Sequence, residues 1–62
     1  MCLSTAYGKK GDESSVLCKN VSKVDIGADS VTLYDLFGSE IVVPGKLISI
    51  DLVENTVIID CA

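Results

Sequence analysis

Histidine and arginine are both absent from this chain of 62 residues. Without histidine, neither a Ser-His-Asp triad nor a Cys-His pair can form. The glycine-rich patterns that bind nucleotide phosphates are missing as well. These absences exclude the most familiar catalytic centres, and we therefore predict a protein that is not an enzyme.

Positive charge is scarce. Five lysines stand against nine acidic residues, which gives a net charge of −4. Nucleic-acid-binding proteins normally carry a basic stripe that replaces phosphate counterions, whereas only Lys9 and Lys10 are adjacent here. Three aromatic residues are too few for a base-stacking platform. The composition argues against nucleic acid as a partner.

Long apolar runs are also missing. The longest aliphatic runs, Ile41–Val43 and Val57–Ile59, are far too short to span a bilayer. The N-terminus lacks the pattern of a signal peptide, so we predict no membrane association and a cytoplasmic location. Three cysteines cannot form a complete set of intrachain disulfides, which agrees with a reducing compartment.

Residues that favour β-structure dominate what is present. Valine, isoleucine and threonine are frequent, and no segment shows the periodicity of an amphipathic helix. We predict one domain over residues 1–62, an all-β, small SH3-like or Sm-like barrel of six or seven short strands. Turns are expected at Gly8–Asp12 and Pro44-Gly45. The expected strands are Cys2–Tyr7, Ser14–Lys19, Val21–Ile26, Val31–Tyr34, Ser39–Val43, Leu47–Leu52 and Thr56–Cys61.

Two of the three cysteines are predicted to be structural. Cys61 shares strand parity with Val57 and Ile59, and Cys18 shares parity with Val16. A buried free cysteine behaves as a small apolar residue. None of the cysteines forms a C-x-x-C motif, so a dithiol redox centre is not predicted.

Cys2 stands apart because of its position in the chain. If Leu3, Thr5 and Tyr7 face inward, Cys2 faces outward, where a thiol contributes nothing to packing. The Met1 α-amine, the Cys2 amide nitrogen and the Cys2 sulfur can close two five-membered chelate rings. Tetragonal nitrogen–sulfur sites suit Ni(II) and Cu(II), and a second chain can supply a missing ligand. The alternative is a Cys2 that is tolerated or buried at an interface.

Several segments together resemble the CooT family of small nickel-binding proteins. They are Met1–Tyr7, Val31–Glu40, Pro44-Gly45 and Ile48–Leu52. The resemblance implies a dimeric small barrel with a role in assembling the nickel–iron–sulfur cluster of carbon monoxide dehydrogenase. It also implies that the key ligand is the cysteine after the initiator methionine, here Cys2.

The leading hypothesis is therefore a nickel-binding accessory protein that assists nickel insertion into carbon monoxide dehydrogenase or another nickel enzyme. Ni(II) is the expected metal, with Cys2 and Met1 as ligands in a homodimer whose interface includes outward Ile58 or Val42. The expected partners are a nickel enzyme or other nickel accessory proteins. One alternative is a protein-interaction module that docks through a barrel edge or an apolar patch. Another is an RNA-binding protein that uses the Lys9-Lys10 loop.

Overall fold

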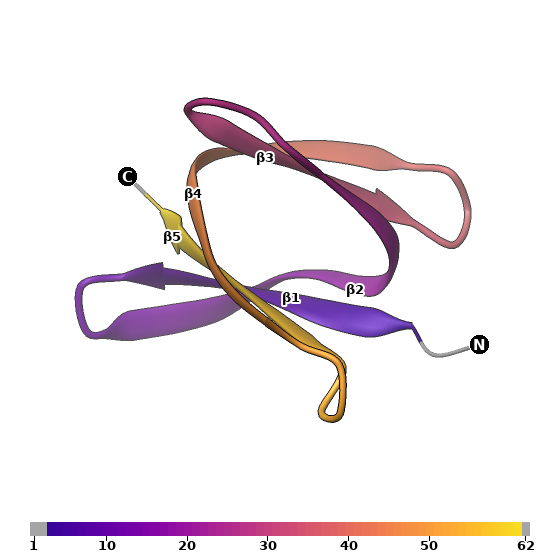
Figure 1. Cartoon of the computed structure of the whole chain (residues 1–62), viewed down its shortest axis with the longest axis horizontal. Helices are drawn as coiled ribbons and strands as arrows, with labels where there is room; N and C mark the ends of the chain where they lie inside the picture. The colour runs from indigo at the N-terminus through magenta and orange to yellow at the C-terminus, as the bar shows by residue number, and fades with distance from the viewer. Residues whose placement is uncertain (1–2, 62) are drawn as a thin grey trace.

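The structure is a computed structural model that describes residues 3–61. Five strands follow one another around a closed barrel (Figure 1). They are β1 (Ser4–Lys10), β2 (Glu13–Ile26), β3 (Ser30–Asp35), β4 (Glu40–Asp51) and β5 (Thr56–Cys61). The predicted small all-β barrel is confirmed, but it has five strands instead of six or seven. The described residues include no helix that could cross a membrane.

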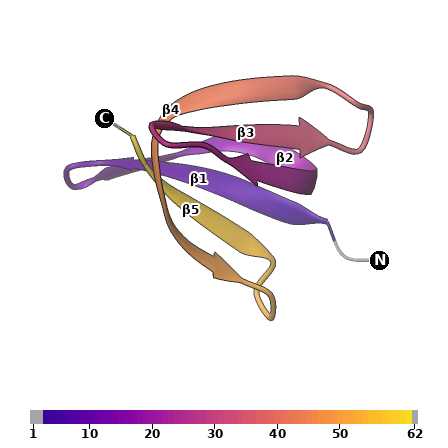
Figure 2. The same cartoon turned by 45° about the horizontal axis from the view of Figure 1, so that its top comes forward.

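Closure of the barrel requires one parallel pair. Consecutive strands run antiparallel to each other, so the first and fifth strands point in the same direction. β1 therefore pairs with β5 in parallel, from Thr5 opposite Thr56 to Lys9 opposite Asp60. Figure 2 shows these two strands beside each other, with the N-terminal end of β1 at the edge of the molecule.

β2 is one bent strand where two were predicted. Its first part pairs with β1 as far as Val21, and its second part pairs with β3 from Val21 onward. Register shifts accompany this exchange of partners, and Asn20 adopts a positive φ of 58°. Bulges bend a strand without ending it, so the predicted interruption after Lys19 is a bend within one strand.

β4 corrects the prediction that Pro44-Gly45 ends a strand. Pro44 pairs with Ser30 of β3, and the next residue, Gly45, pairs with Cys61 of β5. The dipeptide thus marks the point where β4 changes partners. Gly45 has a φ of 140°, and a Cβ there would collide with the Asp60 carbonyl oxygen. Only glycine fits this crossing.

The hydrophobic core fills the interior of the barrel, and all five strands contribute to it. It consists of Ala6, Cys18, Val21, Val31, Leu33, Val43, Val57 and Ile59. The predicted inward parity of Val57, Ile59 and Cys61 is confirmed, although Cys61 is only partly buried. Cys18 is buried while Val16 is half exposed, because a register shift separates them and ends their shared parity.

β1 corrects the sequence-based expectation in two ways. The strand continues through Gly8 to Lys10, so the predicted turn shortens to Gly11 and Asp12. Ala6 and Gly8 are the buried residues of this strand, whereas Thr5 and Tyr7 are only partly buried. The predicted inward face of β1 was therefore wrong.

Candidate functional site

The predicted metal ligands Met1 and Cys2 lie outside the described residues, but the structure fixes where the chain enters the barrel. Ser4 pairs with Val21 of β2. The Thr5 N–H donates to the Asn55 carbonyl oxygen over 2.9 Å. The beginning of β1 is therefore held between the middle of β2 and the loop that joins β4 to β5.

The argument for an outward Cys2 loses its basis, because the inward face of β1 is not the one that was predicted. It depended on inward Leu3, Thr5 and Tyr7, whereas Ala6 and Gly8 are the residues that are buried. The chelate chemistry of the Met1 amine and the Cys2 thiolate does not depend on this face. The prediction of a ligand pair stays a prediction, based on chemistry and resemblance.

A mainly apolar groove opens beside the beginning of β1. Ser4 borders it together with Ser22 and Lys23. Apolar side chains from three strands and one loop line the rest of it: Val21, Val24, Ile50, Leu52 and Val57. The chain segment that carries Cys2 therefore enters the fold next to apolar surface.

The β3–β4 and β4–β5 loops share one pattern of hydrogen bonds. Next to the β3–β4 loop, Asp35 Oδ1 accepts hydrogen bonds from the backbone N–H groups of Phe37 and Ser39, each with a length of 2.9 Å. Next to the β4–β5 loop, Asp51 Oδ1 accepts hydrogen bonds from the backbone N–H groups of Val53 and Glu54, each with a length of 3.0 Å. An aspartate that bonds to nearby backbone N–H groups stabilises a tight turn. The apolar residues that follow each aspartate are left on the surface of the protein.

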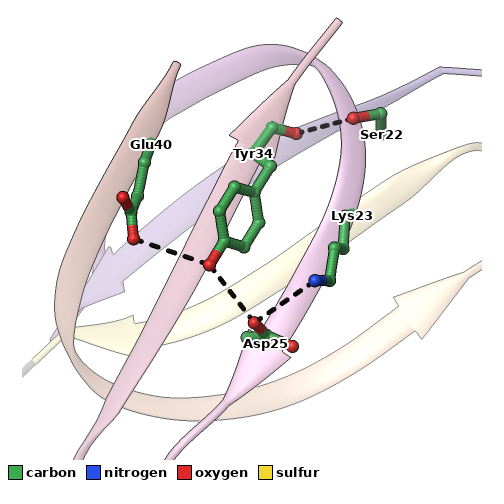
Figure 3. A network of polar contacts seen from close by, with 5 residues as sticks. All are labelled: Ser22, Lys23, Asp25, Tyr34 and Glu40. Atoms are coloured by element: carbon green, nitrogen blue, oxygen red, sulfur yellow. Dashed lines mark hydrogen bonds and ion pairs between the residues drawn. The ribbon is translucent and has the colours of Figure 1, made fainter. Parts of the chain in front are cut away.

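A polar network covers the outer surface of β2, β3 and β4 (Figure 3). The Tyr34 hydroxyl lies 3.2 Å from Asp25 Oδ2 and 3.5 Å from Glu40 Oε2. Lys23 Nζ lies 3.6 Å from the same Asp25 oxygen and 4.9 Å from the centre of the Tyr34 ring. Ser22 Oγ lies 3.2 Å from the Tyr34 carbonyl oxygen. This network links three neighbouring strands on the solvated face.

The environment of Tyr34 favours its neutral form. Desolvation raises the pKa of the Tyr34 hydroxyl, and the charges of Glu40 and Asp25 and their hydrogen bonds raise it further. A phenol that keeps its proton can donate a hydrogen bond to either carboxylate. The arrangement therefore stabilises the outer face of the sheet.

Within residues 3–61, no three side chains of the types Cys, Asp or Glu are grouped closely enough to hold a metal ion.

The remaining cysteines have the packing expected of structural residues. Both are free thiols. Cys18 is 8% exposed, and burial followed by the negative charge of Asp35 raises the pKa of its thiol. Cys61 packs against the core from the end of β5.

Comparison with known proteins decides the family. The model of the family described as CO dehydrogenase accessory protein CooT matches residues 1–60. The chain belongs to the CooT family. The match includes Met1 and Cys2, and the resemblance found in the sequence is confirmed.

A solved structure supports the fold of this CooT family member. The crystal structure of a protein provisionally described as CooT from Carboxydothermus hydrogenoformans superposes on this chain with a TM-score of 0.86. The identity is 21%, and 98% of each chain is covered, so the likeness shows the fold alone. No protein of curated function matches the chain in sequence.

Sequence reasoning missed the groove and the two loops beside the N-terminal strand. A signal was present, since Asp35-Leu36-Phe37 and Asp51-Leu52-Val53 both place two apolar residues after an aspartate. The spacing alone does not show that both loops lie near the beginning of β1.

Proposed function

We propose that this CooT family protein is a carrier, not an enzyme, that binds Ni(II) through Cys2 and assists nickel insertion into carbon monoxide dehydrogenase. The observation that carries the proposal is the family match over residues 1–60, a range that includes Met1 and Cys2. Nickel is cargo in this proposal, and we propose that the protein acts in the cytoplasm.

The chemistry of the N-terminus supports Ni(II) as the cargo. The positive α-amine beside Cys2 favours the thiolate, which is the form of the side chain that binds metals. An amine, an amide nitrogen and a thiolate make a nitrogen–sulfur donor set of the kind that suits Ni(II). Carboxylates alone prefer hard cations such as Mg²⁺ or Ca²⁺.

A homodimer would complete the metal coordination. Two-fold symmetry can bring two Cys2 thiolates to one metal ion. The outer face of β1 and β5 offers an apolar contact surface, where half-buried Ile58 pairs with Tyr7. Ile48, 54% exposed, is the extra residue of a register shift beside Ile58. Val42, the other predicted interface residue, is 60% exposed on β4.

Metal titration tests the proposal. Ni(II)–thiolate charge-transfer absorption should develop with the native protein and be lost in Cys2→Ser. Cys61→Ser and Cys18→Ala are the matched controls, since both remove a thiol from elsewhere in the chain, and both should retain the absorption. Nickel affinity should fall in acid, because binding displaces protons. Unchanged nickel affinity in folded Cys2→Ser would refute the proposal.

Sedimentation equilibrium tests the dimer. The native protein should sediment at twice its chain mass of 6.5 kDa at concentrations of tens of micromolar. Ile58→Lys should shift the equilibrium toward the monomer, because it places a charge in the proposed interface. Ala28→Lys adds the same charge to the exposed β2–β3 turn and should leave the dimer intact. A native protein that sediments only as a monomer would exclude the shared site.

A further inference from the structure

One row of apolar side chains crosses the outer face of four neighbouring strands. Tyr7 lies between two buried residues of β1 and Ile58 between two buried residues of β5, so both point away from the barrel interior. Tyr7 pairs with Ile58 on one side and with Val16 of β2 on the other. Ile48 of β4 is the extra residue of the register shift beside Ile58. We call these four residues the outer stripe, and apolar side chains gathered on one face are typical of an interaction surface.

Polar pairs flank the outer stripe on the same two strands. Lys9 of β1 lies opposite Asp60 of β5, two residues beyond Tyr7 and Ile58. Thr5 lies opposite Thr56, two residues in the other direction. Side chains two residues apart in a strand point to the same face, so both pairs lie on the outer face. One flank of the stripe is therefore charged, with a lysine beside an aspartate, and the other is neutral.

We infer that this face packs against the same face of a second copy, about a two-fold axis that runs between β1 and β5 and parallel to them. This inference rests on the proposed function, because it locates the contact of the proposed homodimer. Rotation about such an axis places β1 of each copy over β5 of the other and keeps every residue at its level along the strands. Tyr7 of one copy then faces Ile58 of the other, across a gap of about 10 Å between the two sheets.

The charged flank selects a second copy as the partner and fixes the direction of the axis. Rotation brings Lys9 of each copy to Asp60 of the other, so the charges alternate in sign around the axis. Complementary charges across an interface favour association. An axis that ran across the strands, along the outer stripe, would instead place Lys9 and Asp60 against Thr5 and Thr56. That arrangement would leave both charges without a partner in the other copy.

The direction of the axis also decides where the two copies of β1 begin. Rotation about an axis parallel to the strands leaves both copies of β1 running in the same direction. Both strands, which start at Ser4, therefore begin at the same end of the dimer and beside its axis. An axis across the strands would place the two beginnings at opposite ends. A metal ion shared through residues that precede β1 requires the first arrangement.

Reciprocal charge substitutions test the placement of the axis. In a homodimer, Lys9→Glu makes all the facing charges negative and Asp60→Lys makes them all positive. Each variant alone should therefore raise the dimer dissociation constant at least about tenfold at low salt. An equimolar mixture should recover nearly native association, because opposite charges again face each other between the two kinds of chain. Like charges remain within each chain, so recovery measured by sedimentation equilibrium reports only the contact between copies.

Lys23→Glu and Asp25→Lys are the matched controls. They make the same changes in a lysine–aspartate pair on another part of the surface, where Lys23 Nζ lies 3.6 Å from Asp25 Oδ2. Each control variant should dimerise as the native protein does. Lys9 and Asp60 are exposed, so their variants should fold, and circular dichroism checks this.

The outcomes separate the contact surface from the metal site. Dimers that persist in both Lys9→Glu and Asp60→Lys would place the contact elsewhere. Monomeric variants that stay monomeric when mixed would show that Lys9 does not face Asp60 of the other copy. Either result would overturn the inference and leave the Cys2 proposal intact, because nickel affinity is measured separately in Cys2→Ser. Recovery in the mixture with unchanged nickel affinity in Cys2→Ser would support the contact surface and refute the metal site.

Discussion

Cys61 Sγ lies 2.7 Å from the position that a Cβ atom on Gly8 would occupy. Two methyl carbons of Leu17 lie 2.9 and 3.0 Å from the same position. Gly8 occupies a buried position of β1 where close packing favours glycine, and its φ is not the reason that glycine is present.

Gly8→Ala should destabilise the fold by about 1–3 kcal/mol, the usual cost of overpacking a core. Adding Cys61→Ala should recover part of this loss, because it removes one of the two colliding groups. Urea unfolding of both single variants and the double variant measures the coupling.

Gly11→Ala is the matched control, because Gly11 has a φ of 64° and open space around its missing Cβ. Its cost should come from backbone strain alone. Rescue of Gly11→Ala by Cys61→Ala to the same extent would contradict the packing explanation.

The two loop aspartates should matter through their acceptor oxygens. Asp35→Ala should lower the free energy of unfolding by about 1–2 kcal/mol, because it leaves two backbone N–H groups without this partner. Asp35→Asn retains an acceptor and should lose less. Thermal unfolding of this series and of the same series at Asp51 checks the expectation, and equal losses for Asn and Ala would indicate that charge is responsible.

Stability should fall in alkaline solution because of Cys18. Burial raises the pKa of the folded thiol above its ordinary value of 9.0. At a pH between the two values, the folded state keeps a proton that the unfolded state has lost, so stability decreases as pH rises. Below pH 9 this contribution is fully present.

Urea unfolding from pH 8 to pH 10.5 measures this slope. Cys18→Ala should flatten it, since the replacement has no titrating group. Cys61→Ala is the matched control and should retain the slope. An identical decline in native protein and Cys18→Ala would assign the alkaline loss to other groups.

Tyr34→Phe should change stability by less than about 1 kcal/mol, because the lost hydrogen bonds are exposed to solvent. The aromatic ring and its contact with Lys23 would remain. Comparison with Tyr34→Ala, which also removes the ring, separates the hydroxyl from the packing. A loss of several kcal/mol in the Phe variant would show that the network carries more than a surface role.

The sequence predicted the architecture where local pattern and pairing agree. Alternation at Val31–Tyr34 and the run Thr56–Cys61 both fall on observed strands. The number of strands was wrong because Asn20 and Pro44 were interpreted as interruptions. Both residues lie where a long strand exchanges one partner for another, which depends on tertiary structure.

The inward face of β1 was wrong for a different reason. The prediction took the face of Leu3, Thr5 and Tyr7 as the inward one, whereas Ala6 and Gly8 are buried. In a narrow five-stranded barrel, β1 passes so close to Leu17 and Cys61 that a small residue must face them. Residue size therefore decides which face of β1 points inward. The hydrophobicity of a residue does not reveal how much space the interior leaves for its side chain.

The candidate site was accessible to sequence reasoning only in part. Cys2 and Met1 were predicted from ligand chemistry and resemblance, and they lie outside the described residues. The groove beside the beginning of β1 could not be predicted, because the fold brings Ser4, Val21, Ile50 and Val57 together from four strands.

Thr5 of β1 pairs in parallel with Thr56 of β5, so the barrel can close only after β5 has been synthesised. β5 leaves the ribosome after all the other strands, and β1 lacks one of its two neighbours until then. Pairing of distant segments is the slow step of folding in small β-proteins. The strand that follows the proposed nickel ligand is therefore fixed on both sides only after β5 has been synthesised, so a shorter nascent chain would lack the finished entry to β1.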